Sequence, residues 1–311
     1  MNYLVLGLGF VATHVAEFLS NYGNVTVTYR NLNPVKEIYM DLLKEKHVNI
    51  IKLDPLIDDI GKYIAQSDTI INLIGEISGS EEALRRANVE VPRLLSKTIS
   101  EINPNATLIH LSGLPGVTGN NVKPETSHCE GINPITLFEK TKCEGERVLK
   151  NNAKFNLAIL RPSLIYGKYG AHIQFITMYR FAKMGFVPSL GFRFSVISAN
   201  ALSRIIKNLS EAKPKFTYFY VTECEPIRID VFFEIMAKTL GKGYIKVPIP
   251  KFLAKAYLPS DIRNLLKYDG TTFDCSKAKE FAGDLKFDEK EVEENAKFLQ
   301  YLDKNRILIP T

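Results

Sequence analysis

Short apolar runs alternate with longer amphipathic stretches over the first half of the chain. Residues 2–6 form the first apolar run, and a helical pattern follows it with Val15, Phe18 and Leu19 on one face. A second apolar run occupies residues 25–29. Strands that alternate with amphipathic helices are typical of a parallel sheet covered by helices on both faces. The pattern predicts an α/β fold with a doubly wound parallel sheet.

The second half of the chain predicts a smaller lobe. Residues 200–209 and 216–221 are read as a helix and a strand that return to the main sheet. The expected main domain therefore covers residues 1–167 with 196–222 returning to it, and residues 168–195 and 223–311 form a smaller C-terminal α/β lobe.

A tight glycine turn joins the first predicted strand to the first predicted helix. In Gly-x-Gly-x-x-Ala, the first glycine permits the turn and the second lets the backbone approach a pyrophosphate. The phosphates then lie at the helix N-terminus. A turn that binds no ligand can have the same Gly-x-Gly-x-x-Ala sequence. The prediction therefore depends on the position of the motif between a strand and a helix. The expected cofactor contacts here are Gly7, Gly9, Phe10 and Val11.

The end of the second predicted strand bears on the choice of cofactor. Dinucleotide folds that bind NAD keep an acidic residue about 20 positions after the glycines. This chain has Arg30 and Asn31 there, directly after Tyr29. The planar guanidinium of Arg30 suits a 2′-phosphate. We therefore expect NADP(H) to be preferred, with NAD(H) left open; the alternative is an arginine that only meets solvent.

Further segments resemble the extended short-chain dehydrogenase/reductase family, the NAD-dependent epimerase/dehydratase group, up to about residue 250. Residues 160–167, Leu-Arg-Pro-Ser-Leu-Ile-Tyr-Gly, match its Arg-Pro-x-x-x-Tyr-Gly stretch, and residues 88–92 and 108–113 are similar to its Asn-Val helix and central strand. The resemblance implies a Rossmann fold. It also implies that the adenine is capped by Asp54 and that the cofactor is lined by Leu73, Ile74 and Gly75.

The departures from the family fall on its catalytic positions. Phe138 stands four residues before Lys142, where the family pattern has Tyr-x-x-x-Lys. Residues four apart share a helix face, so the lysine would lower the pKa of a phenol there, but a phenyl ring carries no proton. Leu114 stands at the expected serine, and Ser112 could replace it only if the loop is remodelled. The resemblance leaves Lys142 a role at the nicotinamide ribose.

Two functions of different class follow. The first is a non-catalytic NAD(P)-binding protein with a degenerate Ser/Tyr/Lys site, similar to the branch that includes the accessory subunit of respiratory complex I. The alternative is an active nucleotide-sugar epimerase/dehydratase or an NAD(P)-dependent reductase with a non-standard proton donor. Six other polar or titratable groups lie in the matched segments and are expected to be structural: His110, Cys129, Thr136, Glu139, Lys140 and Tyr166.

Composition narrows the class of protein. A net charge of +6 without a Lys/Arg run argues against a nucleic-acid partner and suits an anionic ligand. No stretch reaches the roughly 18 apolar residues of a membrane span, so a cytoplasmic location is expected.

The four cysteines show no Cys-x-x-Cys spacing, so we expect buried thiols and neither a disulfide framework nor a metal site. Few glutamines and many lysines, isoleucines and glutamates suggest a thermophile.

Residues 248–258 mix aromatic, apolar and basic side chains in a short helical pattern. Such a segment can lie on a membrane surface or on a protein partner, although a small-lobe helix with its lysines in solvent is the simpler interpretation. The partners left open are therefore a nucleotide sugar or another small molecule, a peripheral membrane or protein-complex contact, and a second copy of the chain.

Overall fold

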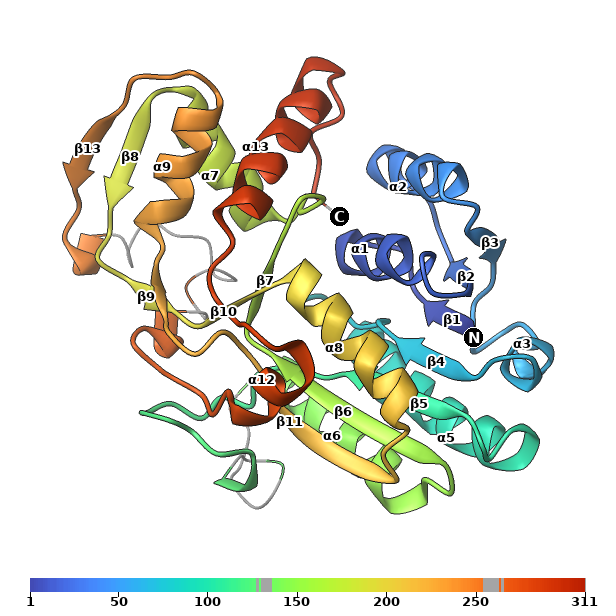
Figure 1. Cartoon of the computed structure of the whole chain (residues 1–311). Coiled ribbons are helices and arrows are strands. Elements are labelled where there is room, and N and C mark those ends of the chain that lie inside the picture. Colours follow the sequence, from blue (N-terminus) through green and yellow to red (C-terminus); the bar gives the residue numbers. More distant parts are fainter. Residues whose placement is uncertain (127–128, 130–135, 254–262, 264–265, 311) are drawn as a thin grey trace.

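The computed structural model describes residues 1–126, 129, 136–253, 263 and 266–310 (Figure 1). Its centre is a seven-stranded parallel sheet in the order β11-β6-β5-β4-β1-β2-β3, which confirms the predicted doubly wound sheet. The order reverses between β1 and β4, where such sheets bind ligands beyond their carboxyl ends. The strands are β1 (Asn2–Leu6), β2 (Asn24–Tyr29), β3 (Asn49–Lys52), β4 (Thr69–Asn72), β5 (Thr107–Leu111), β6 (Asn156–Pro162) and β11 (Phe216–Val221).

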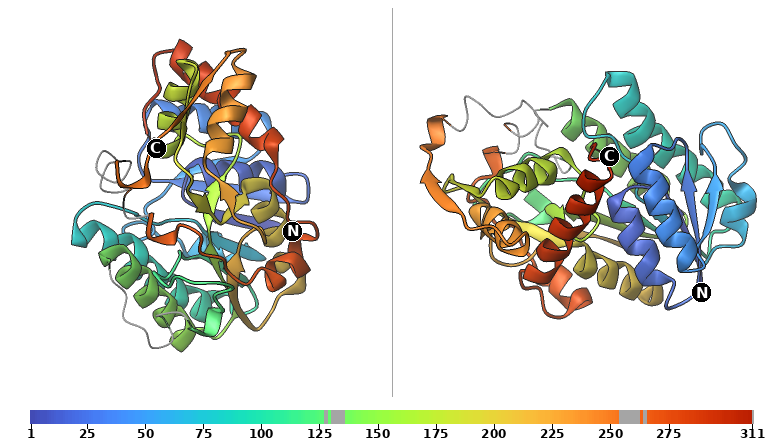
Figure 2. Two further views of the ribbon diagram at one scale, coloured as in Figure 1. Left: turned by 90° about the vertical axis from the view of Figure 1, so that its left-hand side faces the viewer. Right: turned by 90° about the horizontal axis from the view of Figure 1, so that it is seen from above.

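Helices cover both faces of this sheet (Figures 1 and 2). Side chains alternate along each strand, so Val5 and Ile71 enter one apolar layer while Leu4 and Ile70 enter the other. Because each strand is buried on both sides, its sequence is a nearly continuous apolar run. The first layer is closed by α1 (Phe10–Leu19), α2 (Pro34–Glu45) and α8 (Ala199–Ala212), and the second by α3 (Gly61–Ala65), α5 (Val91–Ile102) and α6 (Leu137–Asn152).

A smaller lobe lies beside the main sheet (Figure 1). Its apolar core is continuous with the first layer, since Val15 of α1 and Phe232 of α9 belong to one cluster of buried side chains. The domain boundaries expected from the sequence stay a prediction. The lobe contains the strand pairs β7 (Leu164–Tyr166) with β10 (Val196–Ser198), β9 (Arg193–Phe194) with β12 (Ile227–Arg228), and β8 (Phe186–Ser189) with β13 (Ile245–Pro248), and the helices α7 (Ile173–Lys183), α9 (Asp230–Thr239) and α13 (Glu289–Lys304). Helix α12 (Ser276–Ala282) packs against α8 and β11 of the main domain.

Residues 266–275, which we call the C-terminal strap, run along the loop that follows β5. The backbone of Phe273 forms a parallel bridge with Val122. The Lys123 ammonium pairs with the Asp274 carboxylate at 2.8 Å. The strap therefore holds the loop that leads toward α6. In the described part of the chain, no helix is both long and apolar enough to cross a bilayer.

Candidate functional site

The glycine turn lies at the carboxyl end of β1, beside the strand-order reversal, where sheets of this type place the crevice for a ligand. Gly7 follows β1 with φ of +102°, a conformation that side chains rarely adopt. Gly9 precedes α1, and a Cβ placed on it would meet no atom within 4 Å. The backbone at Gly9 is therefore open to a ligand at the helix N-terminus, where the amides of Phe10 and Val11 begin the helix. The turn lies where the sequence predicts the pyrophosphate.

The end of β2 carries two cations. Arg30 and Asn31 are exposed there, and Lys36 follows on the first turn of α2, which the Asn33 side chain caps by accepting from the Lys36 amide at 2.9 Å. Burial lowers the pKa of Lys36; the nearby Glu76 opposes this shift and Arg30 adds to it. The charges of Arg30 and Lys36 are thus close enough to repel each other. Sequence reasoning missed Lys36, although its place one turn into the helix after Arg30 was a usable signal.

Asp54 follows β3, and its carboxylate already accepts hydrogen bonds within the chain. Its carboxylate accepts from Arg86 Nη2 at 2.8 Å and from the Leu56 amide at 3.1 Å. Arg86 lies on the π-helical turn η1 (Arg86–Glu90), which joins α4 (Glu81–Arg85) to α5. The structure therefore places Asp54 at the expected edge of the sheet, with an ion pair that the sequence did not indicate.

The loop after β4 lies against α6. Leu73 and Ile74 are half-buried, and Gly75 is exposed. A Cβ on Gly75 would lie 2.5 Å from Lys142 Nζ, so the ammonium lies directly against the backbone at Gly75 and a larger residue there would displace it. Asn88 holds this arrangement, because its side-chain amide donates to Thr141 Oγ1 at 3.0 Å and its oxygen accepts from the Glu76 amide at 3.1 Å.

Lys142 spans the gap between the ends of β4 and β5. The residue is 7% exposed, and its ammonium donates to the carbonyl of Leu111 at 3.2 Å. Burial lowers the pKa of Lys142 to about 8, against the opposing effects of Glu146 and Glu76. A partly desolvated ammonium at the carboxyl edge of the sheet is suited to donate to a ligand in the crevice. The structure brings Lys142 together with Gly75, and their shared role at a cofactor stays a prediction.

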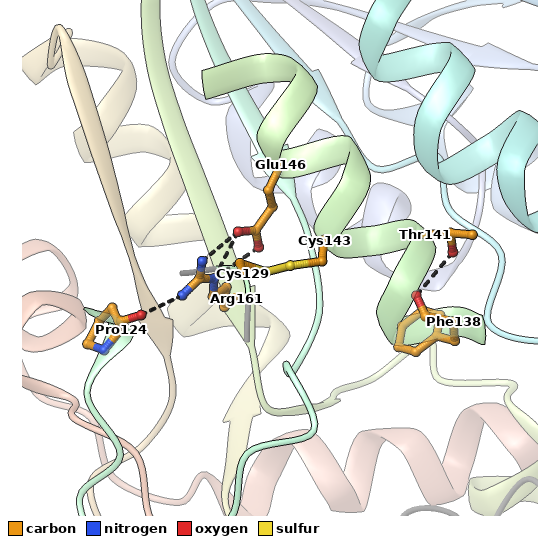
Figure 3. The surroundings of a disulfide bond; sticks show 7 residues. All are labelled: Pro124, Cys129, Phe138, Thr141, Cys143, Glu146 and Arg161. Carbon is orange, nitrogen blue, oxygen red and sulfur yellow. Dashed lines mark hydrogen bonds and ion pairs between the residues drawn. A yellow bond between two sulfur atoms is a disulfide. The ribbon is translucent and has the colours of Figure 1, made fainter. Parts of the chain in front are cut away.

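Phe138 lies beside Lys142 on the same face of α6. A Cβ on Gly113 would lie 3.0 Å from the Cζ atom of Phe138 and 3.8 Å from the Cγ atom of Lys142. Figure 3 shows the Phe138 ring at the start of α6. The backbone carbonyl of Phe138 accepts a hydrogen bond from Thr141 Oγ1 at 3.1 Å. The phenyl ring thus lies next to the lysine, at the end of β5, and it brings no proton donor.

The expected serine position has a structural role here. Leu114 packs against an apolar cluster that includes Tyr220, Tyr268 and Phe273. Ser112 is buried, and no described residue pairs with its hydroxyl oxygen. The hydroxyl oxygen is therefore enclosed and has no partner among the described residues, and it lies two residues before the position of Leu114.

His110 is an enclosed neutral imidazole on β5. Its Nδ1 atom contacts the Asn72 side-chain nitrogen at 3.0 Å, which requires Nδ1 to accept and places the ring proton on Nε2. Burial, with a smaller contribution from Lys142, lowers the pKa of His110 to about 3. His110 is thus packed within the sheet.

The C-terminal strap covers the other face of the α6 start. Glu139 is buried, completes a capping box with Thr136, and pairs with Lys267. The Tyr268 hydroxyl donates to Glu139 Oε1 at 3.3 Å and accepts from the Gly116 amide at 2.8 Å. Burial and the Glu139 carboxylate raise the pKa of Tyr268 above that of a free phenol. The phenol therefore braces the loop, and sequence reasoning missed it because the strap lies far along the chain.

The remaining family-like residues form buried supports. Arg161 pairs with Glu146 at 2.5 Å and donates to the Pro124 carbonyl at 3.0 Å (Figure 3). The Tyr166 hydroxyl donates to Glu223 Oε1 at 2.8 Å. Both are structural roles, as expected for Tyr166.

All four cysteines are paired, which corrects the expectation of buried thiols. Cys129 is bonded to Cys143 of α6 (Figure 3), and Cys224 after β11 is bonded to Cys275 before α12. The fold brings each pair together across 14 and 51 residues of sequence. Spacing along the chain cannot show such pairings, so the absence of Cys-x-x-Cys was a poor guide.

Several solved structures that share this fold are nucleotide-sugar epimerases. UDP-glucuronic acid 4-epimerase from Bacillus cereus, in complex with NAD, matches with a TM-score of 0.77 and 18% identity over 98% of each chain. UDP-N-acetylglucosamine 4-epimerase from Methanobrevibacter ruminantium M1, in complex with UDP-N-acetylmuramic acid, matches with a TM-score of 0.75 and 18% identity over 96% of this chain and 98% of that one.

A mutant of the Bacillus cereus epimerase, with a tyrosine replaced by phenylalanine, matches with a TM-score of 0.76 and 18% identity over 97% of this chain and 100% of its own. It holds NAD and UDP-4-deoxy-4-fluoro-glucuronic acid. No protein-family model and no curated protein matches the sequence. At such identities the likeness shows the Rossmann fold of these epimerases and dehydratases, and the complex I branch is not among these neighbours.

Proposed function

We propose that the chain binds a dinucleotide, with preference for NADP(H) over NAD(H), and does not turn it over. The phenyl ring of Phe138 beside Lys142 carries this proposal. General acid/base catalysis contributes about 10²- to 10⁴-fold, and its proton-carrying group is absent from this position. Without a neighbouring phenol, Lys142 can hold a ligand but does not transfer a proton to or from a hydroxyl group of the substrate.

Two features support retained binding. The backbone at Gly9 is open, and the Lys142 ammonium lies at the edge of the same crevice. These groups suit a pyrophosphate and a ribose, and the nicotinamide would supply hydride chemistry when bound. The phenylalanine mutant of the epimerase holds both NAD and a sugar nucleotide, so loss of a phenol is compatible with binding in this fold.

The preference for NADP(H) follows from Arg30 and Lys36. Two cations near one another at the end of β2 suit a dianionic 2′-phosphate, whereas the 2′-hydroxyl of NAD(H) needs an acceptor. The Bacillus cereus epimerase and its phenylalanine mutant were solved with NAD, so the preference for NADP(H) rests on these two side chains.

Fluorescence titration with NADPH and NADH tests the preference. We expect NADPH to bind more tightly, and Arg30→Ala or Lys36→Ala to weaken NADPH about 10- to 100-fold, the value of a charge-assisted hydrogen bond. NADH binding should change little. Lys44→Ala is the matched control, because Lys44 lies on α2 and pairs with the nearby Asp41. Equal binding of NADH and NADPH by the unmodified chain would overturn the preference.

An active enzyme is the second candidate, and Ser112 is the observation that favours it. Its buried hydroxyl has no partner among the described residues, at the end of β5 near Lys142. In that case Ser112→Ala would abolish turnover of a nucleotide sugar while NADPH binding remained.

We further propose a peripheral contact outside the crevice. Of the stretch 248–258, residues 248–253 lie in the described part of the chain, where Phe252 and Leu253 are exposed. Exposed apolar side chains next to lysines suit a membrane surface or a protein partner.

A further inference from the structure

The outer edge of the small lobe exposes large apolar side chains. Ile245 is 72% exposed, Phe252 70%, Met184 69% and Leu253 40%. The Ile245 amide donates to the carbonyl of Gly185 at 2.9 Å, so the start of β13 lies beside the residue that follows Met184. In Figures 1 and 2, β13 is the outermost strand of the lobe, away from the dinucleotide crevice. We call Met184, Ile245, Phe252 and Leu253 the outer patch.

The segment that carries most of the outer patch contains several lysines and no carboxylate. Residues 235–253 contain Lys238, Lys242, Lys246 and Lys251 and no Asp or Glu. Lys246 pairs with Glu234 and Lys251 with Asp269, yet their side chains are 47% and 49% exposed. Lys238 and Lys242 are exposed as well. The edge therefore combines apolar side chains with positive charge.

The backbone of this edge is poorly suited to a protein strand. Pro248 and Pro250 have no amide hydrogen, so the open side of β13 cannot offer a regular ladder of donors. A bilayer interface needs no such ladder. It takes apolar side chains into the headgroup region and attracts lysines to anionic lipids.

We infer that the outer patch and its lysines bind the surface of an anionic lipid bilayer. This inference deepens the proposed peripheral contact and is independent of dinucleotide binding. Phe252, Leu253 and Ile245 enter the interface, while Lys238 and Lys242 contact the headgroups. The dinucleotide crevice belongs to the main sheet and stays open.

Co-sedimentation with vesicles tests the inference. We expect the full chain to sediment with vesicles of equal phosphatidylglycerol and phosphatidylcholine, and to stay in solution with phosphatidylcholine alone. Ile245→Ser with Phe252→Ser should abolish sedimentation. Lys238→Gln with Lys242→Gln should weaken it about 25-fold, roughly fivefold for each lysine, and high salt should reduce it further. Ile57→Ser is the control for an apolar side chain, since Ile57 is 76% exposed on the main domain.

Three outcomes would overturn the inference: no sedimentation with the anionic vesicles, equal sedimentation of the Ile245/Phe252 variant, or an equal loss with Ile57→Ser. Self-association removed by the same double variant, without vesicle binding, would assign the patch to a second copy of the chain instead. NADPH titration of every variant separates this test from the proposed function, because a failed membrane contact leaves NADPH binding unchanged.

Discussion

At the scale of single residues, the site is defined by what Phe138 lacks and what Lys142 keeps. Gly113 admits the phenyl ring and Gly75 admits the ammonium, so both side chains have dedicated space. Lys142 has no neighbouring phenol with which to share a proton, but its ammonium can still donate hydrogen bonds to a ligand. The retained lysine therefore argues for a binding role.

Phe138→Tyr is predicted to create an acidic phenol. The Lys142 ammonium favours the phenolate, so the pKa of the new tyrosine should fall below its usual value of about 10 by roughly 1 to 3 units. Ultraviolet difference titration against the unmodified chain measures this pKa. Phe138→Tyr combined with Lys142→Met is the control and should titrate at the ordinary value or higher. An unshifted phenol in the single variant would show that the two side chains do not interact.

At the scale of elements, the start of α13 is fastened to β7 and to the segment that follows β11 through the buried carboxyl group of Glu223. Glu223 accepts from the Tyr166 hydroxyl and from the Ser198 amide at 3.1 Å, and the Asp288 amide donates to the same hydroxyl at 2.7 Å. Burial raises the pKa of Glu223 to about 7. The folded state therefore favours the protonated carboxyl.

This shift predicts a pH-dependent stability. Because the folded-state pKa of Glu223 lies above the unfolded value, its contribution is fully present below pH about 4.5 and is lost as the pH rises through about 7. Glu223→Gln, which stays neutral, should raise the free energy of unfolding by about 1 to 3 kcal/mol at pH 8 and by little at pH 4. Chemical denaturation at both pH values measures the difference.

Glu225→Gln supplies the control, because Glu225 is exposed two residues away. It should change stability little at either pH. A Glu223→Gln variant that is destabilised equally at pH 4 and pH 8 would contradict the argument.

Local patterns predict the strands and the glycine turn because burial imposes a periodicity that the sequence must carry. They also place Phe138 and Lys142 on one helix face, since four residues complete about one turn. Contacts across the chain carry no such periodicity. Tyr268 contacts Gly116 across 152 residues of sequence, and no local sequence pattern around either residue predicts the contact.

At the scale of the whole molecule, contacts between residues far apart in the sequence hold the segments near the strand-order reversal. The strap and both disulfides hold the segments around α6 and β11, while the crevice itself opens at the strand-order reversal. A sequence can indicate the sheet order through the alternation of strands and helices. It cannot indicate that Cys224 meets Cys275, because that pairing depends on where β11 and α12 end in space.

The fold is that of nucleotide-sugar enzymes, and the proposed function departs from theirs at the proton donor. The most direct measurement is therefore chromatography of UDP-glucose and UDP-glucuronic acid after incubation with the full chain and either NAD⁺ or NADP⁺. We predict that both sugars are recovered unchanged from the protein with dinucleotide bound. Formation of an epimer or of reduced dinucleotide, abolished by Lys142→Met, would contradict the account.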